Sequence, residues 1–375
     1  MKKNGRITAY IYMDAIARNF QNMRANIKED TQVIAVIKTD GYGHGAVPVA
    51  RMAEQYDYIW GFAVATADEA QELRDAGIRK PVLVLGYTFE EDYERMVRLG
   101  IRPAVFTMEA AASFDREAER QGVCAPVHLA VDTGMSRIGV PDDASGLATA
   151  EQIAALAHLK IEGVFTHFAR ADEADKTNAG GQISRFTAFC DALDAAGITG
   201  FLRHCSNSAG ILELPQANMD LVRAGITIYG IYPSDEVSRV PVTLFPAMEL
   251  KSHVVHVKTV PAGTPVSYGG TFVTQHETQI ATIPVGYGDG YPRGLSGKGS
   301  VLIHGKRVPV LGRVCMDQFM VDVTGMDVRV LDEVTLLGRD GDEEITADEL
   351  GALSGRFPYE LVCCVGRRVP RVYIP

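Results

Sequence analysis

The 375-residue sequence lacks several features that identify particular classes of protein. No apolar run reaches the roughly 18 residues that a membrane-spanning helix needs. There is no basic patch or arm, and the net charge of −10 argues against a nucleic-acid partner. The six cysteines form no CxxC pair and no spaced framework that would bind a metal. We therefore expect no membrane, no nucleic acid and no metal among its partners.

The same absences bear on where the protein is found. Residues 1–5 are basic but lead into a strand pattern, not into the apolar core of a signal peptide. Cysteines without a disulfide framework are typical of free thiols in a reducing compartment. Hydrophobic residues at 46% and charged residues at 22% are ordinary for a globular protein. We expect a cytoplasmic protein that is long enough for two domains.

Strand-like and helical segments alternate through the first part of the chain. Three helical segments end at Gly77, Gly100 and Gly122, a spacing of about 22 or 23 residues that is typical of short βα units. Eight strand-like segments begin at Val33, Tyr58, Pro81, Arg102, Val127, Ile161, Phe201 and Asp220. Eight βα units predict an α/β TIM barrel. A doubly wound open sheet is the alternative fold, but no GxGxxG opens a helix after the first strand.

The helix starts carry capping signals. Thr66 and Thr88 each begin a pattern with glutamate three residues later, which predicts a capping box. Thr107 is a further candidate cap. These three threonines therefore predict where three of the barrel helices begin.

The pattern changes near Pro233. From Leu244 to the end, short strand-like segments are separated by Gly, Pro and Asp turns, and long helical stripes are nearly absent. This arrangement predicts a second, mostly β domain. We place the barrel at residues 1–240 and the β domain at residues 241–375, with the first strand, about 6–12, as a candidate member of the β domain.

Residues able to bind a charged ligand stand where the predicted barrel strands end. Lys38 follows the apolar residues 33–37 and precedes a glycine-rich turn, and a lysine in such a setting can become a nucleophilic amine. The other strand ends carry Leu85, Arg137, His167, Asn207, Ser208, Arg223 and Gly225. Taken singly, each has an ordinary alternative as a surface, packing, salt-bridge or turn residue. Because functional groups of a TIM barrel gather at this rim, we expect one site.

The chemistry of the rim indicates the ligand. One amine, two guanidinium groups and one imidazole suit an anion. The Ser208 hydroxyl and the amides near Gly225 and Ile226 suit a phosphate. A lysine beside a phosphate site on a barrel rim indicates pyridoxal phosphate bound covalently through that lysine.

The β domain offers further candidates. Tyr268 precedes a glycine pair, residues 286–293 form a glycine- and tyrosine-rich loop, and Cys315 begins a Cys-Met-Asp segment. From its spacing alone, Tyr268 is better explained as an aromatic turn residue that covers a core edge. Cys315 has no His-plus-acid arrangement near it, which argues against a nucleophile. Asp289 and Asp317 lack a third ligand at a recognisable spacing, so we expect no metal site.

Together these segments resemble the alanine racemase family, pyridoxal-phosphate enzymes with a barrel and a β domain. The similar segments are, in order, residues 35–45, 132–139, 166–169, 207–208, 223–226, 266–269, 286–290, 315–317 and 368–371. The resemblance covers essentially the whole chain. The segments of the β domain distinguish it from smaller, single-domain cofactor-binding proteins that share the lysine segment.

The resemblance implies a two-base interconversion of L- and D-alanine. A planar Cα must exchange a proton on both faces, and one base does not reach both. The freed Lys38 serves one face and Tyr268 the other. Tyr268 comes from the partner subunit, so the resemblance implies a homodimer with shared active sites. A tyrosine needs cationic or hydrogen-bonded help to act as a base near neutral pH, and His167 and Arg223 resemble the residues that give it.

The resemblance also implies the remaining contacts. Arg223 faces the pyridine nitrogen of the cofactor. Arg137 pairs with the phenolic oxygen and with the substrate carboxylate, to which Met316 offers its backbone N–H. The phosphate is bound by Tyr42, Ser208, Gly225 and Ile226. Leu85 and Asn207 complete the cofactor contacts.

Two positions depart from the family pattern. Where many members carry a carbamylated lysine, this chain has Ala130, so Arg137 must find another anion, such as chloride or a nearby carboxylate. Where a tyrosine usually contacts the phosphate, this chain has Arg367, which could bind phosphate or reshape the pocket. Both positions bear on specificity, so a racemase for serine or for a wider range of small amino acids is the alternative.

Three hypotheses about the function can be distinguished. The leading one is an alanine racemase that supplies D-alanine for cell-wall precursors in a bacterial cytoplasm. A non-catalytic cofactor-binding protein is disfavoured by Tyr268 and by residues 315–317 in the β domain. A decarboxylase on the same architecture would be excluded by mass balance on the substrate.

Overall fold

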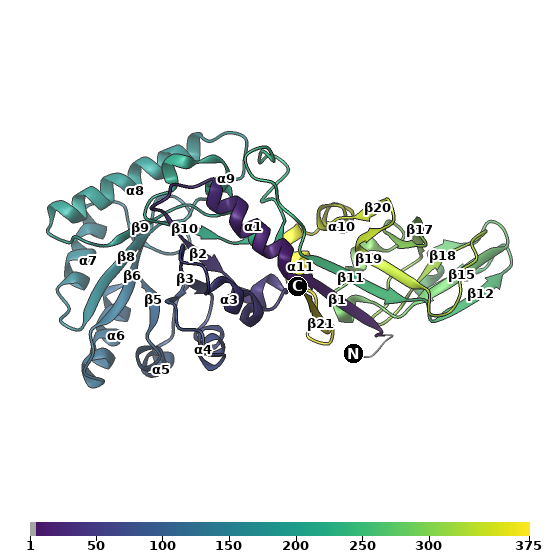
Figure 1. The fold of residues 1–375 in the computed structure, drawn as a ribbon, viewed down its shortest axis with the longest axis horizontal. Coiled ribbons are helices and arrows are strands. Elements are labelled where there is room, and N and C mark those ends of the chain that lie inside the picture. The colour runs from purple at the N-terminus through teal and green to yellow at the C-terminus, as the bar shows by residue number, and fades with distance from the viewer. Residues whose placement is uncertain (1–4) are drawn as a thin grey trace. The chain divides into compact units, whose positions relative to one another are not determined.

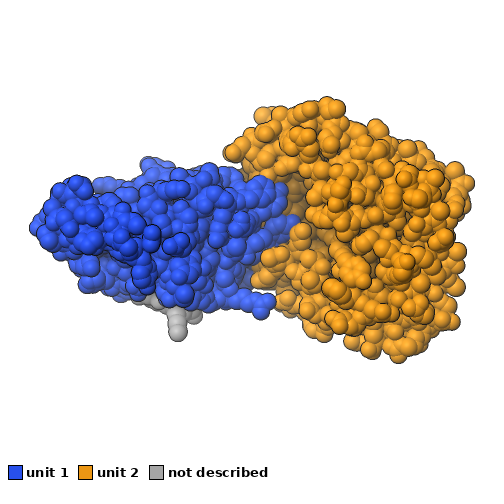
Figure 2. All heavy atoms as spheres, turned by 180° about the vertical axis from the view of Figure 1, so that it is seen from behind, with its two compact units in different colours: residues 1–15, 42–44, 246–375 blue, residues 16–41, 45–245 orange. Residues whose placement is uncertain are grey.

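The computed structural model describes residues 5–375. The chain divides into two compact units, coloured separately in Figure 2. The barrel unit comprises Ile16–Gly41 and Gly45–Phe245, and the β unit comprises Met1–Ala15, Tyr42–His44 and Pro246–Pro375. Among the described residues, no helix is long and apolar enough to cross a membrane.

The barrel unit is built on eight parallel strands (Figure 1). In sheet order they are β10 (Leu221–Ala224), β2 (Gln32–Val36), β3 (Ile59–Val64), β4 (Val82–Val84), β5 (Ile101–Val105), β6 (Ala125–Asp132), β8 (Leu159–Phe165) and β9 (Leu202–His204). The short β7 (Val140–Pro141) pairs with β6. The backbone N–H of Arg223 donates to Ser206 O at 2.9 Å and so links the last two strands. The predicted TIM barrel is confirmed as a nearly closed barrel of parallel strands.

The strands read as apolar runs because both of their faces are covered. Residues 33–36 of β2 and 82–84 of β4 are all buried. Helices follow the strands: α3 (Ala46–Ala53), α4 (Ala67–Asp75), α5 (Tyr93–Arg98), α6 (Met108–Arg120), α7 (Ala144–Ala154), α8 (Thr177–Ala195) and α9 (Ser208–Glu213). The preceding helix, α1, spans Met13–Ala25.

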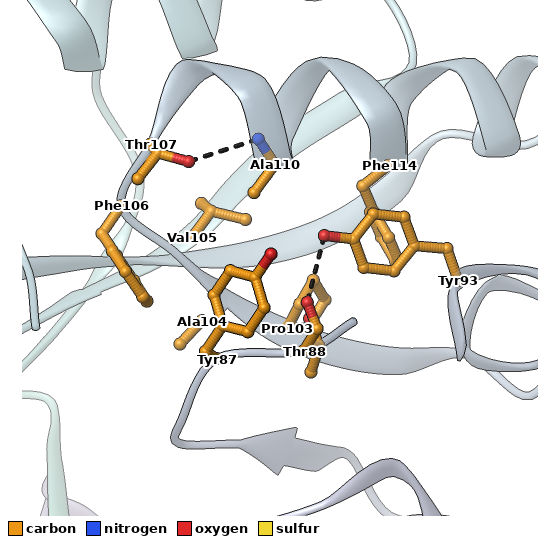
Figure 3. A pocket seen from close by; sticks show the side chains of 10 residues that line it. All are labelled: Tyr87, Thr88, Tyr93, Pro103, Ala104, Val105, Phe106, Thr107, Ala110 and Phe114. Carbon is orange, nitrogen blue, oxygen red and sulfur yellow. Dashed lines mark hydrogen bonds between the residues drawn. The ribbon is translucent and has the colours of Figure 1, made fainter. Parts of the chain in front are cut away.

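The capping signals are only partly correct. Thr66 Oγ1 accepts from Glu69 N, and Thr107 Oγ1 accepts from Ala110 N, each at 3.2 Å, so both threonines cap their helices as predicted. The other half of the predicted capping box does not form, because the Glu69 carboxylate accepts from Thr39 N and Ala65 N in place of Thr66 N. The prediction for Thr88 is wrong, because the helix α5 begins later, at Tyr93, after a short 3-10 turn at Glu90–Asp92. The Thr88 carbonyl instead accepts a hydrogen bond from the Tyr93 hydroxyl at 3.3 Å (Figure 3).

The β unit is a mostly antiparallel sheet. Its strands, in sheet order, are β12 (His256–Val260), β15 (Thr278–Ile283), β18 (Phe319–Asp322), β17 (Lys306–Leu311), β16 (Ser300–Ile303), β19 (Glu333–Asp340), β11 (Met248–His253), β1 (Ile7–Tyr12) and β21 (Arg371–Ile374), with β20 (Glu343–Ile345) on β19. The smaller elements are β13 (Pro265–Val266), β14 (Phe272–Val273), α10 (Ala347–Ser354) and α11 (Pro358–Cys363). Because β1 pairs with both β11 and β21, residues 7–12 lie in this sheet, apart from the barrel strands.

Candidate active site

A cavity of about 100 Å³ lies at the carboxyl-terminal ends of the barrel strands. Its lining comes from the ends of β2, β4, β6, β8 and β10 and from the segments that follow them: Lys38, Leu85, Ala130, Val131, Met135, Arg137, Ile138, Phe165, Thr166, His167 and Arg223. The structure therefore brings five of the predicted site residues together, namely Lys38, Leu85, Arg137, His167 and Arg223. These residues are up to 185 positions apart in sequence, and their common feature is their place after a strand.

Lys38 begins a turn with an unusual backbone, labelled α2 (Lys38–Tyr42). Within this turn Thr39, Asp40 and Gly41 have φ values of 54°, 49° and 60°. A left-handed conformation costs a non-glycine residue about 1–2 kcal/mol. The turn is held by Thr39 N, which donates to Glu69 Oε1 at 2.6 Å, and by Ala46 N, which donates to Asp40 Oδ1 at 2.8 Å. These two hydrogen bonds hold the strained turn in place and so fix the position of Lys38 after the end of β2.

Arg223 is buried in the barrel and has no carboxylate partner there. Its two terminal nitrogens donate to His204 Nδ1 at 2.8 Å, His204 O at 2.9 Å, Thr166 O at 2.6 Å, Cys205 O at 3.0 Å and His167 Nδ1 at 3.3 Å. Its Nε–H makes no hydrogen bond with the residues from 5 to 375. Burial lowers the pKa of Arg223 to about 10, so the guanidinium is charged at neutral pH. This buried donor is oriented by neutral acceptors and has one N–H left for a ligand.

His167 is neutral in this setting. Burial lowers its pKa to about 3, and the charges of Arg223, Arg137 and Lys38 add to the effect. Since Arg223 donates to Nδ1, the imidazole proton lies on Nε2. His167 can therefore accept a proton only at the cost of placing a further cation among three others.

Arg137 stands at the mouth of the cavity on an exposed loop. Asp132 Oδ1 accepts from Gly134 N at 2.9 Å and from Ser136 N at 3.0 Å, which shapes the loop. In the described part of the chain, no hydrogen bond or ion pair joins the Arg137 guanidinium to another residue. Ala130 lines the same cavity with its methyl group and offers no charge. The guanidinium is therefore available to an anionic ligand.

The predicted phosphate residues form a second cluster in the barrel unit. Ser208 Oγ accepts from Gly225 N at 3.0 Å and lies 3.0 Å from Thr227 Oγ1. Asn207 Oδ1 accepts from Gly210 N at 3.0 Å and so caps α9. Ile226 begins the 3-10 turn Ile226–Tyr229 and is fully buried. Converging hydroxyl and amide groups of this kind match the oxygens of a phosphate.

Two other predicted residues belong to the β unit. The backbone of Tyr42 is also left-handed, with φ of 52°, and its ring tilts against Tyr359 at a centroid distance of 6.2 Å. Burial, with a smaller effect of Cys363, raises the pKa of the Tyr42 phenol. Arg367 is exposed.

Tyr268 and Met316 lie in an open hollow of about 690 Å³ in the β unit. The two residues are 70% and 54% exposed. The segment that carries Met316 is fixed by a neighbouring loop, because Tyr287 N donates to Cys315 O at 3.1 Å and Gly288 N donates to Met316 O at 2.9 Å. A Cβ on Gly288 would overlap the Arg368 guanidinium and lie 3.1 Å from Met316 O, so a larger residue there would displace the arginine.

The structure also reveals supporting residues that the sequence patterns did not indicate. Asp289 has a fully buried side chain that accepts from both Arg6 terminal nitrogens, at 2.6 and 2.8 Å, and from Gly286 N at 2.9 Å. Arg368 bridges Asp289 and Asp317 at 2.9 and 2.7 Å. These carboxylates, considered as metal ligands from the sequence, are paired with arginines. The pairing had no local signal, because Arg6 and Asp289 are 283 positions apart.

A second small pocket in the barrel unit is not a ligand site. It is lined by Tyr87, Tyr93, Phe106 and Phe114 among others (Figure 3), and its volume is about 10 Å³. This is at the lower limit for a single water molecule. Figure 3 also shows the hydrogen bond from Ala110 N to Thr107 Oγ1 at its edge. The pocket is a gap between packed side chains.

Comparisons with known proteins identify the family. The family description "Alanine racemase, N-terminal domain" matches residues 11–233, and "Alanine racemase, C-terminal domain" matches residues 247–373. Alanine racemase of Desulforamulus reducens is 47% identical, with 98% of this chain and 99% of that protein covered. The protein of the same name from Methanococcus maripaludis is 46% identical, with 98% of both chains covered.

Solved structures give the same result. Alanine racemase of Clostridium difficile 630 has a TM-score of 0.94 and 40% identity, with 100% of this chain and 97% of that chain covered. Alanine racemase of Bacillus anthracis with bound L-Ala-P has a TM-score of 0.94 and 36% identity, with 100% and 96% covered. Alanine racemase of Bartonella henselae with covalently bound pyridoxal phosphate has a TM-score of 0.87 and 26% identity, with 98% and 99% covered.

Proposed function

The chain belongs to the alanine racemase family, and we propose how its own residues interconvert L- and D-alanine. The protein is an amino-acid racemase that uses pyridoxal phosphate and acts on alanine. The alternative of a serine or broad-specificity racemase is not favoured, because the relatives and the neighbouring structures bear the name alanine racemase. The assignment of roles to individual residues is our proposal.

The residues on the barrel rim fit pyridoxal phosphate. Lys38 supplies the amine that binds the cofactor covalently. The Nε–H of Arg223 would donate to its ring nitrogen, and Arg137 would bind its phenolic oxygen. Ser208 and the amides of Gly225 and Ile226 bind its phosphate, with Tyr42 as a further phosphate ligand and Leu85 and Asn207 at its edges. When bound, the cofactor withdraws electrons from the substrate Cα and makes its proton acidic.

Two bases on opposite faces then exchange the Cα proton. Lys38 Nζ removes or returns the proton on one face, and Tyr268 Oη does so on the other. The neutral His167 and the charged Arg223 stabilise the phenolate form of Tyr268, whose reference pKa is about 10. Arg137 and the backbone N–H of Met316 hold the substrate carboxylate. Arg367 contributes a positive charge near the cofactor phosphate.

We propose that Tyr268 and Met316 act in the partner subunit's site within a homodimer. Their exposure in an open hollow supports this proposal. A catalytic base in a closed site is shielded from water, and in this proposal the partner subunit shields Tyr268. In the same proposal, residues 1–240 bind the cofactor and residues 241–375 complete the partner's site. We further propose that the protein works in a bacterial cytoplasm and supplies D-alanine for the cell wall.

The observation that carries the proposal is the setting of each base within its own unit. Lys38 lines the barrel cavity with two arginines and a histidine, whereas Tyr268 lies exposed on the β unit. Lys38→Ala and Tyr268→Phe should each be inactive in conversion of L-alanine to D-alanine, followed by chiral chromatography. Unfolding and refolding the two variants together should restore about a quarter of wild-type activity, because half of the dimers are mixed and each has one intact site. No recovery on mixing, or full activity of Tyr268→Phe, would refute the shared two-base site.

A further inference from the structure

Two buried histidines of the barrel take no part in the proposed reaction. His128 on β6 and His204 on β9 are both fully buried. His128 Nδ1 lies 2.9 Å from His204 Nε2, and His204 Nδ1 lies 2.8 Å from Arg223 Nη1. On its other side, His128 Nε2 lies 3.4 Å from Glu162 Oε2. A hydrogen-bonded series therefore runs from Arg223 at the rim to Glu162 inside the barrel.

The direction of this series follows from its ends. A guanidinium only donates hydrogen bonds, so His204 Nδ1 must be an acceptor and its proton must lie on Nε2. His204 Nε2–H then donates to His128 Nδ1, which places the second proton on His128 Nε2. That N–H donates to the Glu162 carboxylate, which only accepts. Each histidine is therefore held in a single tautomer by a group that has no alternative role.

The electrostatics agree with neutral histidines. Burial lowers the pKa of His128 and outweighs the opposite effect of Glu162. Burial also lowers the pKa of His204, and the charge of Arg223 lowers it further. Burial raises the pKa of Glu162, but hydrogen bonds from His128 and Arg102 outweigh this and lower it to about 2. Arg102 Nε donates to Glu162 Oε2 at 2.8 Å and completes the series with a second cation. The Glu162 carboxylate thus contacts Arg102 directly and is linked to Arg223 through the rings of His128 and His204.

The pairing of β6 with β8 is irregular where this hydrogen-bonded series passes between them. The pairing of β6 with β8 passes from Val127 opposite Ile161 to His128 opposite Gly163, so Glu162 is a bulged residue. β-Bulges re-aim a side chain, and here the bulged glutamate meets His128 and Arg102. A Cβ on the next residue, Gly163, would overlap the His128 ring. The glycine therefore makes room for the imidazole that the bulged glutamate contacts.

A second bulge supports the same histidine. β2 and β3 pair Val33 with Ile59 and then Ile34 with Gly61, so Trp60 is the extra residue. Its ring lies 5.4 Å from the His128 ring, and Arg102 lies over its face at 5.9 Å. Two strands thus depart from regular pairing at residues that surround His128.

We propose that Glu162, His128 and His204 are positioning residues that fix the tautomer presented to Arg223 and so keep its Nε–H directed at the cofactor's ring nitrogen. The ring-nitrogen contact rests on the proposed function, but the tautomers do not. Without the carboxylate, His128 loses the acceptor for its Nε2 proton. A flip of that proton to Nδ1 would face the His204 N–H, and the conflict would pass to Arg223.

The first test needs no substitution. Histidine labelled with ¹⁵N in the wild-type holoenzyme should show His128 and His204 as neutral, Nε2-protonated rings throughout the neutral pH range, with signals assigned by His128→Asn and His204→Asn. A Nδ1-protonated His204, or either ring charged at neutral pH, would overturn the proposal. This measurement is independent of racemase activity, so it separates failure of the proposal from failure of the two-base site.

The second test uses Glu162→Met and Glu162→Gln, with Glu117→Met as the matched control. Glu117 is also a glutamate paired with an arginine, but it lies on α6 away from the cavity. Glu162→Met should bind pyridoxal phosphate about tenfold more weakly, as followed by its absorbance, and should mix the His128 tautomers. Glu162→Gln keeps an acceptor oxygen and should recover most of the affinity. Unchanged tautomers and affinity in Glu162→Met, or equal losses in Glu117→Met, would refute the positioning role.

Discussion

Replacing Gln182 by methionine should destabilise the barrel by about 3 kcal/mol. Gln182 lies on α8 and is fully buried. Its amide nitrogen donates to His167 O at 2.9 Å and to Thr133 Oγ1 at 3.1 Å, and its oxygen accepts from Ala169 N at 2.9 Å. The side chain thus links the loop after β6, which leads to Arg137, to the loop after β8, which carries His167.

The magnitude follows from the groups that lose a partner. Methionine has nearly the same volume, so the cavity contribution is small. Thr133 Oγ1 keeps its hydrogen bond to Thr166 Oγ1 at 2.7 Å. The His167 carbonyl and the Ala169 N–H lose their hydrogen bonds to residue 182. A buried group left without a partner costs about 1–3 kcal/mol. Ala169 is exposed and can be solvated, so it should lie at the low end of this range.

The chain allows a clean assay for this prediction. Its single tryptophan is Trp60, on the barrel strand β3, so tryptophan fluorescence during urea unfolding reports the barrel unit. Gln152→Met is the matched control, because Gln152 is exposed on α7. If Gln182→Met shifts the unfolding midpoint no further than Gln152→Met, the three hydrogen bonds do not hold the two loops together and the reasoning is wrong.

Three further predictions follow from other parts of the structure. Asp289→Asn should destabilise the β unit by about 3 kcal/mol, because Arg6 and Arg368 lose a buried carboxylate partner. Urea unfolding followed by circular dichroism measures this loss. An effect below about 0.5 kcal/mol would contradict the prediction, since ordinary surface substitutions have effects of that size. Thr39→Gly should stabilise the barrel by about 0.5 kcal/mol in the tryptophan assay, because relief of the left-handed strain exceeds the entropy cost of glycine; a loss of stability would contradict it. The barrel should lose stability as pH falls below about 6.5, because His167 has a folded pKa of about 3 and is protonated first in the unfolded chain. A further loss should follow below about pH 4.5, because Glu162 has a folded pKa of about 2 and is also protonated first in the unfolded chain. A urea midpoint that is constant between pH 7 and pH 5 would refute this prediction.

The sequence predicts the barrel and its rim because both follow from a regular rule. In parallel strands the carboxyl ends meet at one edge, so a residue that follows an apolar run is placed without knowledge of the packing. This rule groups Lys38, Arg137, His167 and Arg223 correctly in one cavity. It does not give the conformation of the turn at Lys38. Gly41 signals a left-handed residue, but Thr39 and Asp40 share that conformation and have no such signal.

Local patterns fail where the fold gives a residue a different partner from the one that the pattern indicates. The sequence around Thr88 satisfies the capping-box pattern, yet the helix starts later and the Thr88 carbonyl is bound by Tyr93. Asp289 resembles a possible metal ligand until Arg6, at the other end of the chain, is known to lie against it. In both cases the pattern records what a residue can bind, whereas the fold decides which partner reaches it.

The two bulges show why the interior of the barrel is harder to predict than its rim. A period-2 pattern assigns Glu162 and Trp60 to regular positions on their strands, and the glycine after each, Gly163 and Gly61, is read only as a weak strand residue. The structure gives these glycines a steric purpose, since a Cβ on Gly163 would overlap His128 and one on Gly61 would overlap the Pro81 backbone. A large polar or aromatic residue followed by glycine inside an apolar barrel strand is therefore a signal for a bulge. In this chain both bulges converge on His128, which lies two hydrogen bonds from Arg223, so the departures from regular pairing mark the buried groups that orient the site.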